Sequence, residues 1–141
     1  MARYEYQYRS VLASEEAMLD DLGLALSIPG IPIAIKQGFT LAVCEAFTNA
    51  LLHGNQSDPS KLINVVLEVN ETGIRADITD EGTGGLSRIA NRKDRGLLAE
   101  GGRGIALIEH YADNVTFEEN AAGGLKVTIR VSITKTQKTH A

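Results

Sequence analysis

Two pairs of strand-like segments, each joined by a short polar turn, constrain the fold of this 141-residue chain most strongly. Residues 62–69 (LINVVLEV) are mostly apolar and rich in β-branched residues, and residues 73–79 (GIRADIT) alternate apolar and polar positions. Nearer the C-terminus, residues 114–119 and 125–133 flank the turn NAAGG, and the second of these segments is apolar at every other position. Because successive side chains of a strand point to opposite faces, the pattern predicts two β-hairpins in a sheet with one apolar face.

The remaining periodic segments predict one further strand and three helices. Residues 3–9 (RYEYQYR) alternate tyrosine with polar residues, as a half-buried strand does. Ser14 is a candidate N-cap for a first helix. Pro32 suits the first turn of a second, longer helix that runs to His53. Residues 105–112 form the third helix of this prediction.

The polar, glycine-rich stretch from Gly82 to Gly104 has no sustained period and is expected to be irregular. The predicted order is strand, helix, helix, strand, strand, loop, helix, strand, strand. This order predicts an α+β fold: a two-layer α/β sandwich in which one mixed, mostly antiparallel sheet carries helices on a single face. We expect residues 1–134 to form one domain and residues 135–141 to be a disordered C-terminal tail.

Composition excludes several functional classes. A net charge of -4 and a pI near 5.3 argue against direct nucleic-acid binding, which normally needs a basic surface. The single cysteine, Cys44, excludes an internal disulfide and is expected to be a small core residue of a cytoplasmic protein rather than a nucleophile. Since the chain has neither a membrane-length apolar run nor a signal-peptide core, we expect no membrane association.

The second helix carries three polar residues at a spacing of four: Glu45, Asn49 and His53. Positions four apart lie on one face of a helix, so these side chains form a single polar ridge. The alternative is that this ridge is an ordinary solvent-facing stripe.

Two further clusters flank the irregular stretch. In DITDEGTGG, Asp80 ends a strand, and Gly82 and Gly84 follow at alternate positions. In EGGRGIALIEH, Gly102 and Gly104 precede a helix, where backbone N–H groups can approach a phosphate closely. Taken alone, either cluster is typical of many surface turns.

Together, and in this order, the three motifs ExxxN, DxGxG and GGxG resemble the N, G1 and G2 boxes of the GHKL superfamily of ATP-binding domains. The element order also resembles that superfamily's ATP-binding fold over nearly the whole chain. Within the superfamily, EAFTNALLHGN and GGRGIALIEHYAD are similar to the anti-sigma-factor serine/threonine kinases. Those are bacterial proteins that bind a sigma factor and phosphorylate a serine of its antagonist.

The resemblance implies a role for each motif residue. Asn49 corresponds to the asparagine that holds Mg²⁺ bound to the nucleotide phosphates, and Glu45 to the general base. Asp80 corresponds to the aspartate that accepts a hydrogen bond from the adenine amino group, which favours ATP over GTP.

The glycines of the two boxes have implied roles as well. Gly82 and Gly84 would let the backbone pass close to the base, and Gly102 and Gly104 would bring amides to the phosphates. Arg103, between the last two, is expected either to reach a phosphate or a partner protein or to be exposed.

Less specific expectations concern the other polar residues. The resemblance implies that Thr128, on the polar side of the last strand, approaches the adenine through a water molecule. No catalytic role carries over to His53, which is expected to be structural. A basic run beside the site either attracts the triphosphate or an acidic partner, or is solvated; it comprises Arg88, Arg92, Lys93 and Arg95.

The resemblance thus implies a cytoplasmic ATP- and Mg²⁺-dependent protein kinase that phosphorylates an antagonist protein and sequesters a sigma factor. The alternative is a regulatory binding module of the same fold in which ATP sets the conformation without useful phosphotransfer. A homodimer is also expected, because the aromatic first strand offers an exposed sheet edge. The segment between Gly84 and Gly101 is expected to be a mobile lid.

Overall fold

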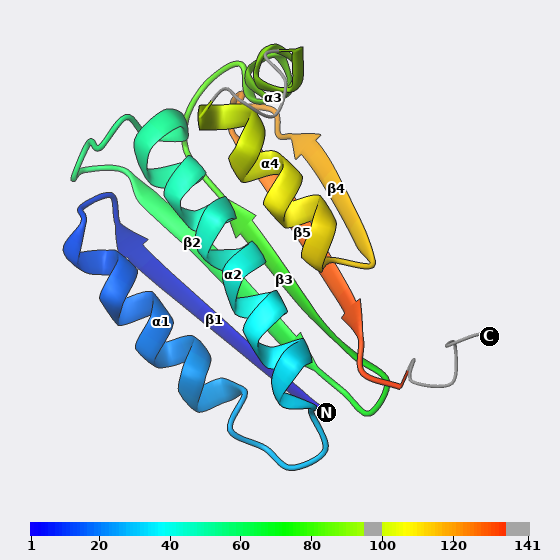
Figure 1. The fold of residues 1–141 in the computed structure, drawn as a ribbon. Helices are drawn as coiled ribbons and strands as arrows, with labels where there is room; N and C mark the ends of the chain where they lie inside the picture. Colours follow the sequence, from blue (N-terminus) through cyan, green and yellow to red (C-terminus); the bar gives the residue numbers. More distant parts are fainter. Residues whose placement is uncertain (95–99, 135–141) are drawn as a thin grey trace.

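The computed structural model describes residues 1–94 and 100–134, without the side chains of residues 92–94 and 100–103. Its five strands form one sheet in the order β1-β2-β3-β5-β4, and all four pairings between neighbouring strands are antiparallel (Figure 1). The sheet expected to be mixed therefore has no parallel pair among the described strands. The strands are β1 (Ala2–Arg9), β2 (Leu62–Val69), β3 (Gly73–Thr79), β4 (Asn114–Glu119) and β5 (Leu125–Ser132).

The helices cover one face of this sheet, and the shortest described α-helix, α3, lies over one end of it (Figure 1). This arrangement confirms the α+β, two-layer prediction. The helical elements are α1 (Ala13–Ala25), α2 (Ile33–Asn49), the π-helical turn η1 (Ala50–Gly54), α3 (Gly85–Asp94) and α4 (Glu100–Tyr111).

The core lies between the two layers, as the alternation of the strands predicts. Along β2 the buried positions are the alternate residues Ile63, Val65, Leu67 and Val69, while their neighbours are half-buried on the other face. Phe47 of α2 is fully buried and meets Tyr8 edge-to-face at a ring separation of 5.5 Å. Contacts of this kind fix α2 across the middle of the sheet.

The predicted strands are confirmed, and three predictions about helices are wrong. Ser14 lies inside α1, whose N-cap is Leu12 and has no side-chain cap. The stretch expected to be irregular contains α3, and α4 begins at Glu100 rather than at Ile105. Helix α3 was not recognisable because it buries few apolar side chains: Ile89 is buried, but Leu86 is 47% exposed.

The long second helix ends where predicted but with a different geometry. After Asn49 it widens into the π-helical turn η1, in which the Asn55 N–H donates to the Ala50 carbonyl at 2.8 Å. Such turns add one residue to a helical turn and are frequent near functional sites. Gly54 thus ends a helical segment, as the sequence indicates.

Two of the expectations fall on parts of the chain that are not described. The expected disordered tail, residues 135–141, lies outside the described residues, and so do residues 95–99 of the expected lid. Within residues 1–94 and 100–134, no helix has the length and apolar character that crossing a membrane requires.

Candidate functional site

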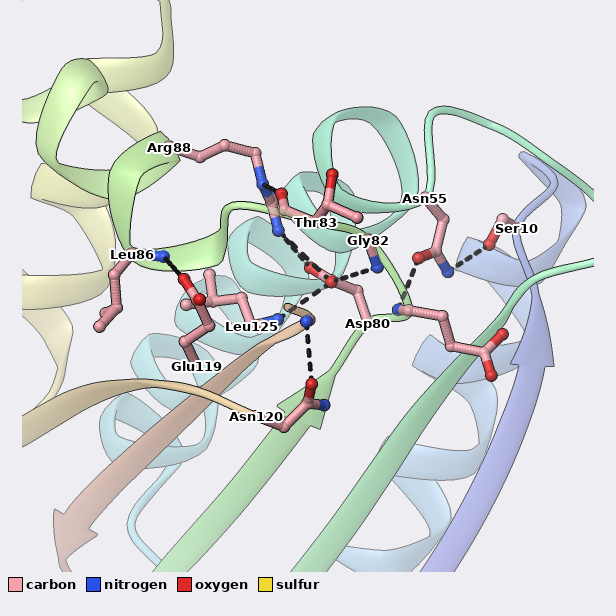
Figure 2. Close-up of polar contacts among 12 residues, drawn as sticks. Ser10, Asn55, Asp80, Gly82, Thr83, Leu86, Arg88, Glu119, Asn120 and Leu125 are labelled. Carbon is pink, nitrogen blue, oxygen red and sulfur yellow. Dashed lines mark hydrogen bonds and ion pairs between the residues drawn. The ribbon is translucent and has the colours of Figure 1, made fainter. Parts of the chain in front are cut away.

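Asp80 stands at the end of β3, and its carboxylate is held by the backbone of the neighbouring loops (Figure 2). Its Oδ1 accepts hydrogen bonds from the Gly82 N–H at 2.9 Å and from the Leu125 N–H at 3.1 Å. The Asp80 N–H in turn donates to the Leu125 carbonyl at 3.0 Å. The carboxylate, almost completely buried, therefore has a fixed position beside the start of β5.

Glycines allow the backbone of η1 to touch this carboxylate. A Cβ atom on Gly54 would lie 2.1 Å from Asp80 Oδ2, and one on Gly82 would lie 2.2 Å from the Gly54 carbonyl oxygen. Both positions exclude any larger residue unless the backbone shifts. Gly84 has open space around it but a φ of +62°, which favours glycine for conformational reasons.

Asn55 connects η1 to the loop that carries Asp80. Its fully buried side chain accepts the Glu81 N–H on Oδ1 at 2.7 Å. Its Nδ2 donates to Ser10 Oγ at 2.8 Å (Figure 2) and to the Leu62 carbonyl at 3.0 Å. Three of the four hydrogen-bonding positions of the Asn55 amide are thus engaged. The side chain joins the residue after β1, the start of β2 and the loop that carries Asp80.

Sequence reasoning missed Asn55. A polar residue directly after a helix-ending glycine is a weak signal, because the usual interpretation is a surface turn. Two of its three partners lie 26 and 45 residues away in the chain, so only the fold reveals them.

Arg88 of α3 also contacts Asp80. Its Nη2 lies 3.2 Å from Asp80 Oδ2, and its Nε donates to the Thr83 carbonyl at 3.1 Å (Figure 2). Of the predicted basic run, this arginine is therefore paired with the site's own carboxylate rather than solvated. The side chains of Arg92 and Lys93, and all of Arg95, lie outside the described residues.

The polar ridge of α2 meets the start of α4. A Cβ atom on Gly104 would lie 3.0 Å from Glu45 Oε1 and 3.9 Å from Asn49 Oδ1. Glu45 is half-buried and Asn49 is buried, so neither belongs to a simple solvent-facing stripe, whereas His53 is exposed. The structure therefore brings together Glu45, Asn49 and the glycine of the third motif.

Gly102 and Arg103 lie in the first turn of α4 rather than in a loop before it. The side chain of Arg103 lies outside the described residues, so the expectation about it is not addressed by the structure.

Thr128 does not join these residues. It is paired in register with Asp77, and its hydroxyl donates to Asp77 Oδ1 at 2.8 Å. Its neighbours Val127 and Ile129 are buried in the core, so Thr128 points to the face of the sheet opposite the helices. The residue of β5 that contacts Asp80 is Leu125, through its backbone.

Cys44, next to Glu45, is half-buried rather than fully buried as a core residue would be. Burial raises the pKa of its thiol, and the nearby carboxylates of Glu15 and Glu45 raise it further. A raised pKa disfavours the thiolate, so this environment supports the expectation that Cys44 is not a nucleophile.

Within the described part of the chain, no three His, Cys, Asp or Glu side chains are grouped so as to hold a metal ion. A cation near Asn49 would need most of its ligands from a bound phosphate or from water. Mg²⁺ commonly binds in this manner, with one or two protein ligands besides phosphate oxygens.

The fold and these contacts define a class of protein: an α+β domain with helices on one face of an antiparallel sheet, with the buried carboxylate of Asp80 beside η1 and with Glu45 and Asn49 beside the start of α4. Residues 9–131 match the histidine kinase-like ATPase domain, so the chain belongs to that family. This family implies ATP binding and confirms the resemblance to the GHKL superfamily.

Several proteins similar to this chain are named anti-sigma F factors. The chain is 28% identical over 100 residues to an anti-sigma F factor of a Geobacillus species, covering 67% of this chain and 68% of that protein. It is 29% identical over 94 residues to the anti-sigma F factor of Clostridium beijerinckii, covering 63% and 65%. These matches support the narrower resemblance to the anti-sigma-factor kinases.

A solved structure shares the fold. The RsbU and RsbW domains of Rv1364c from Mycobacterium tuberculosis match with a TM-score of 0.68 at 19% identity. The match covers 93% of this chain but only 32% of that one, so this chain spans about a third of its length.

Proposed function

We propose that this protein is an anti-sigma factor with ATP-dependent serine/threonine kinase activity, which phosphorylates an antagonist protein and sequesters a sigma factor. The observation that carries the proposal is the meeting of Glu45 and Asn49 with Gly104, on the helix α2 whose π-helical continuation η1 ends at Gly54, beside Asp80. The continuous segment α2–η1 thus joins the candidate adenine-binding site at Asp80 to the candidate phosphate-binding site at Glu45 and Asn49.

At the adenine-binding end of the proposed pocket, Asp80 accepts a hydrogen bond from the adenine amino group. Its Oδ1 is already engaged by two backbone N–H groups, so Oδ2 is the atom offered to a ligand. A carboxylate can only accept, and adenine presents an amino donor where guanine presents a carbonyl oxygen. The expected preference for ATP over GTP follows from this difference.

At the other end, Asn49 would hold Mg²⁺, and the backbone near Gly102 and Gly104 would lie beside the phosphates. The proximity of Gly104 to Glu45 supports this role, because a side chain at position 104 would fill the same space. ATP, when bound, supplies the phosphoryl group, and Mg²⁺ neutralises its charge.

Glu45 is the general base. Its half-buried carboxylate takes the proton from the serine hydroxyl of the antagonist as that oxygen accepts the phosphoryl group and ADP leaves. Because Glu45 lies one turn before Asn49, proton transfer and metal binding occur on the same helix face.

The partners follow from the relatives, which are anti-sigma F factors by name. The antagonist and a sigma factor are the proposed partners here, in the cytoplasm, and a homodimer through the free edge of β1 is proposed with them.

Co-purification tests the proposal. The tagged protein is isolated from its own cells with Mg²⁺ and ATP, its partners are identified by mass spectrometry, and each partner is offered labelled ATP. Capture of a sigma factor and phosphorylation of a second partner on serine or threonine is the expected result. Capture without phosphorylation of any partner would favour a binding module of the same fold.

A further inference from the structure

Arg88 forms a largely buried ion pair with the residue proposed to recognise adenine. The Asp80 side chain is 1% exposed and the Arg88 side chain 21% exposed, with Nη2 and Oδ2 3.2 Å apart. Exposed ion pairs contribute little and exchange readily, but a pair with a buried carboxylate is retained because its loss leaves a buried charge uncompensated.

The acceptor positions of Asp80 are nearly all in use. Oδ1 accepts from Gly82 and from Leu125, and it also lies 3.4 Å from Arg88 Nη2. Oδ2 faces the backbone of Gly54 on one side, where a Cβ atom would come within 2.1 Å. Because a carboxylate offers about four acceptor positions, the accessible direction on Oδ2 is the one that Arg88 occupies.

We propose that Arg88 competes with the nucleobase for Asp80, so that base binding requires this guanidinium to leave the carboxylate. This inference rests on the proposed role of Asp80 in ATP binding. Its consequence is that the apparent affinity for adenine is lowered by the fraction of molecules in which Arg88 is paired.

The side chain, not the helix, is the moving part. Helix α3 keeps two anchors that do not involve Asp80: the Leu86 N–H donates to Glu119 Oε1 at 3.0 Å (Figure 2), and Ile89 is buried. The Nε that contacts the Thr83 carbonyl belongs to the same planar guanidinium as the Nη2 that contacts Asp80, so this group moves as a unit. Release of Asp80 therefore needs a rotation of the outer part of one arginine.

The binding of adenosine distinguishes competition for Asp80 from electrostatic attraction of the ATP phosphates by Arg88. An arginine that attracts the triphosphate favours ATP but has no effect on a neutral nucleoside. An arginine that blocks the base weakens both ligands. When Arg88 is removed, the two roles therefore predict opposite changes in ATP affinity, and only competition for Asp80 predicts tighter binding of adenosine.

The experiment is an NMR titration of the backbone amides with adenosine and with Mg·ATP. This method can measure dissociation constants in the millimolar range. The parent is compared with Arg88→Ala and with Arg88→Gln, which keeps a polar side chain of moderate length. The control is Arg130→Ala, because Arg130 is an exposed arginine on the opposite sheet face that contacts Asn114. It removes the same charge without touching the site.

We expect both Arg88 variants to bind adenosine about three- to tenfold more tightly than the parent, as the release of a largely populated competitor predicts, with no change in the control. Unchanged or weaker adenosine binding in a folded Arg88 variant overturns the competition while leaving ATP binding by the parent intact. If neither parent nor variants bind ATP or adenosine, the proposed function itself fails, and this inference fails with it.

Discussion

Gly54 and Asp80 are in direct contact: a Cβ atom at position 54 would lie 2.1 Å from Asp80 Oδ2. The end of one helical segment and the end of one strand thus meet without room for a methyl group. We expect Gly54→Ala to displace the carboxylate, reduce ATP affinity at least tenfold and lower stability by about 1–3 kcal/mol, as overpacking does.

Gly23→Ala is the matched control, because a Cβ atom there meets nothing within 4 Å and the residue lies inside α1. It should stabilise the protein by about 0.5–1 kcal/mol and leave ATP affinity unchanged. Calorimetric titration and thermal unfolding measure both effects. Equal ATP affinity in Gly54→Ala and the parent would contradict the assignment of this contact to the site.

Asp80→Asn should weaken ATP binding and reduce the preference for ATP over GTP. The amide has no charge and can present a donor where the adenine amino group needs an acceptor. Asp77→Asn is the control, since Asp77 is a buried aspartate on the opposite sheet face, paired with Arg75. The measurement is calorimetry with both nucleotides; a parent that binds ATP and GTP equally well disproves the role of Asp80.

Asn55→Ala should lower both stability and nucleotide affinity. It removes the acceptor of the Glu81 N–H and two donor contacts, at a cost of about 2–3 kcal/mol for buried groups left unsatisfied. Ser10→Ala breaks only the far end of this network, so it should destabilise by about 1 kcal/mol but keep nucleotide affinity. Urea unfolding measures the stability of both variants, and ATP titration measures their nucleotide affinity. If the role of Asn55 were purely structural, the two folded variants would bind ATP equally well.

Glu45 and Asn49 share a helix face, but substitutions of the two residues should impair different steps. Asn49→Ala removes the proposed metal ligand, so Mg²⁺-dependent ATP binding should weaken. Glu45→Gln keeps the size and removes the base, so ATP should bind while phosphotransfer falls about 10²–10⁴-fold.

Single-turnover transfer of labelled phosphate to a co-purified antagonist measures this difference, with ATP affinity determined alongside. The control is Glu16→Gln, an exposed glutamate of α1. Transfer at the parental rate in Glu45→Gln would show that another group accepts the proton.

Cys44 should be alkylated slowly at pH 8. Burial and the neighbouring Glu15 and Glu45 raise the pKa of its thiol above the ordinary 9.0, so less thiolate is present at that pH. The reaction rate with iodoacetamide should rise with pH to a midpoint above 9.0 in the folded protein, and the midpoint should fall in denaturant. A folded-state midpoint below 9.0 is incompatible with this environment.

The sheet and the motif residues could be predicted because their signals are local. The apolar, β-branched run of β2 and the alternation along β3 and β5 are each visible within eight residues, and Glu45 and Asn49 share a helix face by spacing alone. Asp80 could be singled out only through the order of the three motifs, because an aspartate directly after a strand is also typical of an ordinary turn.

The contacts between distant segments could not be predicted in this way. Arg88 appeared as one of several lid cations, and nothing in its spacing indicates that it reaches back to Asp80. Helix α3 was missed since a helix anchored by one buried isoleucine, a backbone contact to Glu119 and an arginine has little apolar period. Thr128 was correctly placed on the polar side of its strand, but the consequence, that this side faces away from the helices, depends on the layer arrangement.

The π-helical turn η1 sets the angular relation between the two ends of the proposed pocket. Each residue advances an α-helix by about 100°, so the extra residue in the widened turn delays the backbone by that angle. Asn49 thereby faces α4 while Gly54, five residues later, faces the end of β3. If the same five residues wound as a regular α-helix, Gly54 and Asn55 would be rotated by about a further 100° and would turn away from the Asp80 loop. The widened winding of this one turn, as much as the chemistry of its residues, therefore brings the end of the helical segment to the carboxylate.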